Sequence, residues 1–202
     1  MAWECSHDLS SYLIKSLLDE SSRIAELLKR RDDLITICEL GCGKAIPAAG
    51  LVDSLMSQGY RGKVRLILQD LDGRTIETVT KPNIEARLDQ LQTSGQLDVI
   101  VEYVACSWEN IDSFSYEANI ILSSECIYRS DLFSSHAAVI ARMLSSDGVA
   151  VFAAKRYYFG CGGGTIDFCE FLDQSTLGLK SELVEVIENG RSNTREILEI
   201  FR

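Results

Sequence analysis

The chain has 202 residues, of which 46% are hydrophobic and 25% are charged, and its formal net charge is −10 at pH 7. This length is sufficient for one substantial hydrophobic core, and no linker, repeat or low-complexity tract divides the sequence, so residues 1–202 are expected to form a single domain. Direct nucleic-acid binding is not expected, because phosphate neutralisation requires clustered lysine and arginine. A basic protein or peptide suits an acidic chain better as a partner, although the charge would also serve solubility alone.

The sequence also limits the compartment. The longest apolar runs have the length of strands, so no membrane-spanning helix is predicted. The N-terminus lacks the basic and apolar blocks of a signal peptide. Seven cysteines at irregular spacing predict neither a disulfide framework nor a metal site, and His7 and His136 have no partner at metal-ligand spacing. We therefore expect a reducing compartment, the cytoplasm or the nucleus.

Helical and strand-like segments alternate along the chain. Helices are predicted near 9–18, 22–29, 45–58, 75, 85–92, 132–144 and 167–172, and strands at 34–39, 64–68, 99–105, 120–123, 149–154, 183–187 and 195–201. Asn189-Gly190 between the last two strands is a strong hairpin signal. This order predicts an α/β fold: a doubly wound, seven-stranded, mostly parallel sheet with an antiparallel C-terminal hairpin strand. That is the class I methyltransferase architecture rather than the all-parallel dinucleotide fold.

The first predicted strand ends on Glu39 and turns through Gly41 and Gly43 into a helix, as nucleotide-binding turns do. Ile46 stands where a dinucleotide enzyme would have its third glycine. Glu39 favours a ligand with a cationic group over a pyrophosphate, and S-adenosylmethionine carries a sulfonium and an ammonium. Gly41 and Gly43 are expected to line the methionine portion, with Glu39 in a network near its ammonium. A tight strand-to-helix turn of any α/β domain is the alternative.

Two further residues suit such a cofactor. Asp70 ends the second predicted strand, where an acidic residue takes the ribose hydroxyls of a nucleotide; an ordinary solvated loop carboxylate is the alternative. Trp108 follows the third strand and is placed to contact the adenine, unless it is a plain core tryptophan.

A glycine-rich loop follows the fifth predicted strand. Tyr158, Phe159 and Gly160 precede Cys161, and the consecutive glycines Gly162–Gly164 follow it. Because glycines permit close approach of another backbone, we expect this loop to form a wall of a substrate cleft. The aromatic residues could instead pack under the hairpin.

Motifs across nearly the whole chain resemble those of the histidine protein methyltransferase family. They are, in order, Trp3-Glu4-Cys5 with Asp8-Leu9, Glu39-Leu40-Gly41-Cys42-Gly43, Gln69-Asp70, Pro82-Asn83, Ser107-Trp108, Ser124-Glu125-x-x-Tyr128 and Tyr158-Phe159-Gly160-x-Gly162-Gly163-Gly164. The resemblance implies transfer of a methyl group from S-adenosylmethionine to a histidine imidazole, typically in a basic large-subunit ribosomal protein, with a nucleolar location among those expected. One departure is Lys44-Ala45 in place of a Ser-Gly pair, which is expected to stiffen the turn.

On this resemblance, Glu125 and Tyr128 are the catalytic candidates, and Trp3 and Ser123 are assigned to the cofactor site. Glu125 could accept the N–H of the imidazole and stabilise the charge that grows on the ring during methylation. A helix-start carboxylate and a core tyrosine are the alternative for this pair. Two other functions remain open at this point: lysine methylation by the same signature family, and S-adenosylmethionine binding without catalysis.

Overall fold

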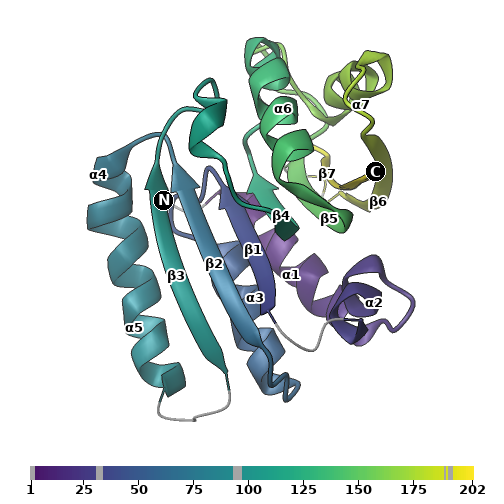
Figure 1. Ribbon diagram of the computed structural model, residues 1–202. Coiled ribbons are helices and arrows are strands. Elements are labelled where there is room, and N and C mark those ends of the chain that lie inside the picture. Colours follow the sequence, from purple (N-terminus) through teal and green to yellow (C-terminus); the bar gives the residue numbers. More distant parts are fainter. Residues whose placement is uncertain (1–2, 31–33, 93–96, 189, 191–192) are drawn as a thin grey trace.

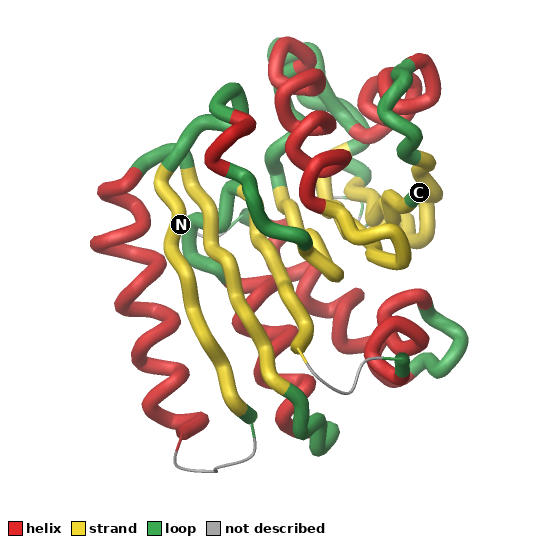
Figure 2. Tube along the Cα trace, in the orientation of Figure 1, coloured by secondary structure: helices red, strands yellow, loops and turns green. Residues whose placement is uncertain are grey.

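A sheet of seven strands forms the centre of the molecule, and helices lie against both of its faces (Figure 1). This computed structural model describes residues 3–30, 34–92, 97–188, 190 and 193–202. Helices and strands alternate along most of the chain, and the loops that join them gather at the two ends of the strands (Figure 2).

The strands lie in the order β3-β2-β1-β4-β5-β7-β6 across the sheet. Their bounds are β1 Leu34–Leu40, β2 Lys63–Asp70, β3 Asp98–Ala105, β4 Ala118–Ser124, β5 Leu144–Lys155, β6 Lys180–Ile187 and β7 Arg195–Phe201. Strands from β3 to β5 pair in parallel, whereas β7 is antiparallel to both β5 and β6. The predicted sheet with its antiparallel C-terminal strand is therefore confirmed. Of the predicted Asn189-Gly190 turn, only Gly190 lies within the described residues.

The helices are α1 Glu4–Leu18, α2 Arg23–Lys29, α3 Ile46–Ser57, α4 Gly73–Thr75, α5 Lys81–Gln92, α6 Phe133–Met143 and α7 Thr165–Gln174. Helix α1 begins earlier than predicted because Cys5, Leu9 and Leu13 recur every four residues and share one buried face. The helices predicted near residues 75 and 85–92 are joined into one segment, since a π-helical turn, η1 Ile76–Thr80, connects α4 to α5.

Two buried clusters fix the helices to opposite faces of the sheet. Helices α1, α2 and α3 pack with η1 and α5 on one face, and α6 and α7 cover the other. Successive side chains of β4 point to opposite faces of the sheet and so contribute to both clusters. Ile120 and Leu122 belong to the first cluster, and Ile121 belongs to the second. None of the helices in the described part of the chain is long and apolar enough to cross a membrane.

An aromatic stack lies between α6 and the sheet. The imidazole of His136, from α6, stacks on Trp108 with ring centroids 4.0 Å apart, and on Phe152 of β5 at 5.1 Å. The His136 side chain is only 1% exposed, and burial lowers the pKa of this histidine from 6.5 to about 3. Its ring is therefore neutral in the folded protein at ordinary pH, as an aromatic stacking partner should be.

Replacement of His136 by phenylalanine should make the free energy of unfolding less sensitive to acid. The unfolded chain binds a proton at this histidine below pH 6.5, whereas the folded chain binds it only near pH 3, so the contribution of His136 to stability is lost as pH falls through this window. Without this imidazole, the slope of the free energy of unfolding against pH should be lower by up to about 1.4 kcal/mol per pH unit. Urea unfolding at a series of pH values measures the slope.

The exposed His7 provides the control for this experiment. His7→Gln should keep the wild-type slope, and an equally steep slope in His136→Phe would show that burial of this imidazole does not limit acid stability.

Candidate active site

Two adjoining pockets lie where β1, β2 and β4 end, and both are lined by Gly41, Asp70 and Cys126. The first, here called the glycine-turn pocket, has a volume of about 350 Å³ and is lined by Trp3, Ser6, Gly41, Cys42, Gly43, Lys44, Ile46, Asp70, Thr75, Val79, Ser124, Glu125 and Cys126. The second, here called the Trp108 pocket, has a volume of about 190 Å³ and is lined by Gly41, Gln69, Asp70, Leu71, Cys106, Ser107, Trp108, Cys126, Tyr128, Leu132 and Ser135. Crevices at the carboxyl ends of strands are the usual ligand sites of such sheets.

The glycine turn after β1 brings backbone N–H groups to the site. Gly41 and Gly43 both have positive φ, 65° and 47°. A side chain at Gly41 would collide with the Cys126 sulfur, which lies 2.5 Å from the position of a Cβ, whereas a Cβ at Gly43 would meet nothing within 4 Å. Gly41 therefore allows the turn to pack on the chain just after β4, and Gly43 leaves the pocket open.

Ala45 continues the turn in a left-handed conformation, with φ 53° and ψ 39°. This conformation costs an alanine about 1–2 kcal/mol, which the usual glycine would avoid. Two side chains from the helical segment hold the strained turn in place: Thr80 donates to the Gly43 carbonyl at 2.6 Å, and Asn83 donates to the Lys44 carbonyl at 2.6 Å. Thr80 lies in the π-helical turn, a feature that often marks functional sites.

Glu39 lies behind the turn and lines neither pocket. Its side chain is buried, and one carboxyl oxygen accepts the Ala48 N–H at 2.9 Å, which satisfies a free donor in the first turn of α3. Burial raises the pKa of Glu39 from 4.5 to about 8. The structure thus places Glu39 where it orients the helix that follows the turn, and not against the pocket itself.

Gln69, for which no role was predicted, connects the glycine turn to the wall of the Trp108 pocket. Its buried amide oxygen accepts hydrogen bonds from the Gly41 N–H at 3.1 Å and from the Trp108 indole at 2.9 Å. Its amide nitrogen donates to the Cys106 carbonyl at 2.7 Å. The position of Trp108 is therefore set by a hydrogen bond on its nitrogen and by the His136 ring on its face.

Asp70 lies at the junction of the two pockets, as a ribose-binding residue should. One carboxyl oxygen accepts the Gly43 N–H at 2.9 Å and the other accepts the Asp72 N–H at 3.1 Å. Since each carboxylate oxygen has two lone pairs, one acceptor position on each remains for a ligand hydroxyl. Trp3 lines the glycine-turn pocket and is 61% exposed.

Ser123 is buried on the other side of the sheet and lines neither pocket. Its hydroxyl lies 3.4 Å from the Leu40 carbonyl and 3.5 Å from His136 Nε2. The neighbouring Ser124 lines the glycine-turn pocket, and its hydroxyl lies 2.9 Å from that of Ser6 in α1. The prediction for Ser123 is therefore corrected to Ser124.

Glu125 follows β4 with a left-handed backbone, φ 57°, a strained conformation of the kind often found at functional sites. Its carboxyl oxygen Oε2 accepts a hydrogen bond from the Tyr158 hydroxyl at 2.5 Å. That hydroxyl in turn accepts one from the backbone N–H of Lys155 at 3.2 Å. Burial and then the charge of Glu125 raise the pKa of Tyr158, so the phenol stays protonated and donates. Burial and Glu125 likewise raise the pKa of the Cys5 thiol.

The other carboxyl oxygen of Glu125, Oε1, is buried and accepts no hydrogen bond from the described residues. The Lys155 ammonium lies 3.7 Å away. A buried acceptor without a donor is unfavourable unless a ligand supplies one.

Tyr128, the other catalytic candidate, lies apart from Glu125 and Lys155. It lines the Trp108 pocket, and its ring lies edge-on to that of Tyr158, with 6.2 Å between the ring centroids.

The glycine loop packs against the chain itself, which corrects the prediction for two of its glycines. A Cβ on Gly163 would lie 2.5–2.7 Å from backbone atoms of residues 127–129, and a Cβ on Gly164 would lie 2.1 Å from the Arg156 carbonyl oxygen. Both are buried, so they admit this backbone and not that of a substrate. Gly160, Gly162 and Phe159 are exposed and remain candidates for substrate contact.

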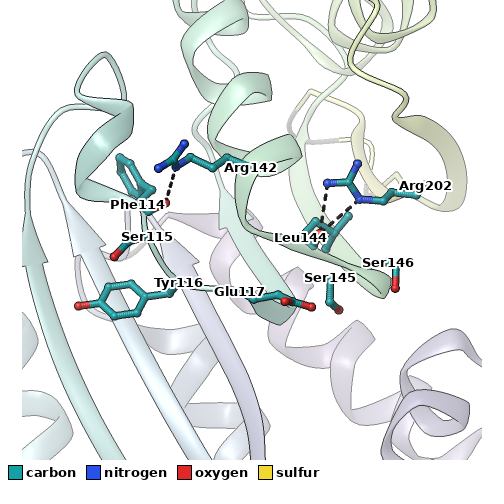
Figure 3. A pocket seen from close by; sticks show the side chains of 9 residues that line it. All are labelled: Phe114, Ser115, Tyr116, Glu117, Arg142, Leu144, Ser145, Ser146 and Arg202. Carbon is teal, nitrogen blue, oxygen red and sulfur yellow. Dashed lines mark hydrogen bonds between the residues drawn. The ribbon is translucent and has the colours of Figure 1, made fainter.

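A further hollow, of about 680 Å³, lies away from these motifs (Figure 3). It is formed where β4 and β5 begin, together with Arg142 of α6 and Arg202. Arg142 donates to the Phe114 carbonyl at 2.7 Å, and Arg202 donates to the Leu144 carbonyl at 3.3 Å. The main chain thus already engages both guanidinium groups.

Comparison with known proteins identifies the family. The model of a family described as lysine methyltransferase matches residues 1–159. The chain belongs to this methyltransferase family. It is 30% identical, over 98% of its own length, to a histidine protein methyltransferase 1 homologue of Dictyostelium discoideum, and 27% identical, over 93%, to one of Rattus norvegicus. These matches cover 56% and 52% of the two relatives, so this methyltransferase spans about half of their length.

Solved methyltransferases share the fold. The DszA carbon methyltransferase aligns with a TM-score of 0.65 at 14% identity, over 99% of this chain and 55% of its own. The magnesium protoporphyrin IX methyltransferase of Synechocystis PCC 6803, solved with bound SAH, aligns with a TM-score of 0.61 at 11% identity, over 98% and 83%. These neighbours show the class I methyltransferase fold.

The residues of the two pockets fit S-adenosylmethionine, the cofactor that the sequence motifs predict. The open cradle at Gly43 suits the methionine portion, the remaining acceptor positions on Asp70 suit the ribose hydroxyls, and the apolar wall at Trp108 suits the adenine.

Asp70→Ala should weaken S-adenosylmethionine binding at least about tenfold, because each lost charge-assisted hydrogen bond is worth about 1.5–3 kcal/mol. It should also lower the free energy of unfolding by about 1–3 kcal/mol, since the Gly43 and Asp72 N–H groups lose their acceptor. Calorimetric titration and thermal unfolding measure the two effects.

The matched control is Asp72→Ala, two residues away. Asp72 caps α4 by accepting the Arg74 N–H and lines neither pocket, so its loss should reduce stability but leave cofactor affinity unchanged. Equal cofactor affinity in the two variants would remove Asp70 from the binding site.

Gly163→Ala should destabilise the fold by about 2 kcal/mol or more, because the methyl group would overlap backbone atoms that cannot move aside. Gly160→Ala, in the same loop, adds a methyl group with no atom within 4 Å and should cost only about 1 kcal/mol, for its positive φ of 81°. Chemical unfolding of both variants tests this order. Should Gly163→Ala be as stable as wild type, the packing described for the loop is wrong.

Proposed function

We propose that this chain is a protein-histidine N-methyltransferase that transfers a methyl group from S-adenosylmethionine to an imidazole nitrogen. The observation that carries the proposal is Glu125 at the edge of the glycine-turn pocket: one of its carboxyl oxygens is held by Tyr158, and the other is buried and has no hydrogen-bond donor in the described part of the chain. The names of the relatives support the choice of histidine.

The free oxygen of Glu125 matches the chemistry of a neutral imidazole. Such a ring has a lone pair on one nitrogen and an N–H on the other, and the reference pKa of 6.5 leaves it largely neutral at pH 7. Glu125 Oε1 would accept the N–H and fix the tautomer, so that the other nitrogen faces the donor. As the ring becomes positive, the carboxylate would stabilise that charge, and it would then receive the released proton.

Tyr158 and the α1 residues support Glu125. The Tyr158 phenol fixes the Oε2 side of the carboxylate, and its raised pKa keeps the hydroxyl a donor rather than a competing anion. The buried Cys5 and the Ser6–Ser124 contact hold the start of α1 over the same end of the pocket. Bound S-adenosylmethionine supplies an electrophilic methyl carbon attached to its sulfonium.

For the substrate, we propose a basic protein, with a large-subunit ribosomal protein as the specific candidate. The net charge of −10 favours a basic partner. This choice places the enzyme in the cytoplasm or the nucleus, the nucleolus included. Lysine methylation is the second candidate, because the matched family model is described as lysine methyltransferase.

Incubation of the protein with tritiated S-adenosylmethionine and a cell extract separates the two candidates. Acid hydrolysis of the labelled protein followed by amino-acid analysis should give tritiated methylhistidine. Label in methyllysine alone would favour the second candidate, and cofactor binding without any labelled protein would indicate a non-catalytic module.

Glu125→Gln should keep S-adenosylmethionine affinity but lower the rate of methyl transfer at least about tenfold, because the amide carries no charge to stabilise an imidazolium. Tyr158→Phe should lower the rate in the same direction, since Glu125 loses the hydroxyl that positions it. Single-turnover transfer to the labelled protein, with cofactor affinity measured separately, gives both values.

Tyr157→Phe is the matched control, because it removes a hydroxyl from the neighbouring tyrosine, which is exposed and lines neither pocket. It should retain the wild-type rate within about threefold. If Glu125→Gln transfers methyl groups as fast as wild type, Glu125 has no part in the reaction.

A further inference from the structure

The ammonium group of Lys155 occupies an unusual place beside the candidate active site. Lys155 is the last residue of β5, and its nitrogen lies 3.7 Å from Glu125 Oε1. The same nitrogen lies 5.5 Å from the centre of the Tyr158 ring and 6.0 Å from that of Trp3. It thus faces one carboxylate and two aromatic rings.

We propose that Lys155 determines the specificity of the site, because it takes the place of a substrate ammonium and thereby makes the site select a neutral imidazole over a lysine side chain. This inference rests on the proposed function. The matched family model is described as lysine methyltransferase, whereas the relatives are named for histidine.

A carboxylate flanked by aromatic faces is the environment that attracts an alkylammonium ion. In this protein the chain itself provides that ion. The side chains of Lys155 and Glu125 are only 23% and 8% exposed, so solvent screens their interaction less than it would at the surface. The charge of Glu125 is therefore already balanced before a substrate arrives.

A second ammonium at this position would be repelled by that of Lys155. It would also find the Glu125 carboxylate already paired with a cation. A neutral imidazole meets no such repulsion. Its N–H would supply the hydrogen bond that Glu125 Oε1 lacks among the described residues, because Lys155 stays 3.7 Å away, beyond the usual length of a hydrogen bond.

The chemistry of the two acceptors reinforces this selection. A lysine ammonium must release a proton before its nitrogen lone pair can form the new N–C bond. A neutral imidazole already has the lone pair. When its N–C bond forms, the C–S bond of the donor breaks with its electrons remaining on sulfur, and the ring releases its N–H proton afterwards.

The test uses wild type, Lys155→Met and Lys155→Arg, each incubated with tritiated S-adenosylmethionine and cell extract. After acid hydrolysis, the ratio of methyllysine to methylhistidine is measured for each variant. Lys155→Met should raise this ratio at least tenfold, because it removes the charge and keeps the length of the side chain. Lys155→Arg keeps the charge and should keep the wild-type ratio.

The ratio separates specificity from folding, because a purely structural role would lower both products together. Thermal unfolding and cofactor affinity confirm that each variant is folded. If Lys155→Met does not fold, Lys155→Gln, whose neutral amide can still donate to Glu125, replaces it in the same measurement.

An unchanged ratio in the folded neutral variant would overturn the role of Lys155 and leave histidine methylation standing. The proposed function fails in a different way, since wild type would then label lysine or label no protein.

Discussion

The geometry of the site depends on one buried amide, the side chain of Gln69. Its oxygen accepts from the turn after β1 and from the Trp108 indole, and its nitrogen donates to the chain after β3. A buried amide is tolerated only when its groups are paired, so these three contacts form together or not at all. Because the partners come from two separate segments, the turn after β1 and the chain after β3, the glycine turn and the wall of the Trp108 pocket take up their positions jointly.

Buried charge gives the protein two opposing responses to pH. Burial raises the pKa of Glu39 to about 8, so its contribution is favourable at low pH and is lost as pH rises from 4.5 to about 8. The lowered pKa of His136 acts in the opposite direction, since its contribution is lost as pH falls from 6.5 to about 3. Between pH 4.5 and 6.5 the two slopes oppose each other. In this range, the stability that His136 loses as pH falls is therefore partly offset by the stability that protonation of Glu39 restores.

The sequence predicted what local patterns determine. Apolar runs and glycines located the strands and the turn, and the order of elements predicted the sheet, including its antiparallel strand. Ser123 shows the limit of such reasoning: successive residues of a strand point to opposite faces, so an error of one residue at the end of β4 selects the wrong side.

Other features depend on contacts between distant segments. Three consecutive glycines indicate that something approaches closely, but only the fold shows that residues 127–129 do so at Gly163. Likewise, Tyr158 and Glu125 are 33 positions apart, and no spacing rule joins them. The free oxygen of Glu125 and the neighbouring ammonium of Lys155 could be recognised only after β4 and β5 were paired.

The left-handed alanine at position 45 has a consequence for how this sequence can change. Ala45 keeps its conformation under strain, and two side-chain hydrogen bonds hold the turn before it, from Thr80 to the Gly43 carbonyl and from Asn83 to the Lys44 carbonyl. Loss of either side chain would therefore harm a protein with alanine at this position more than one with glycine. The three positions are therefore epistatic: glycine at 45 would relax the constraint on 80 and 83, whereas alanine at 45 makes both side chains necessary for the turn.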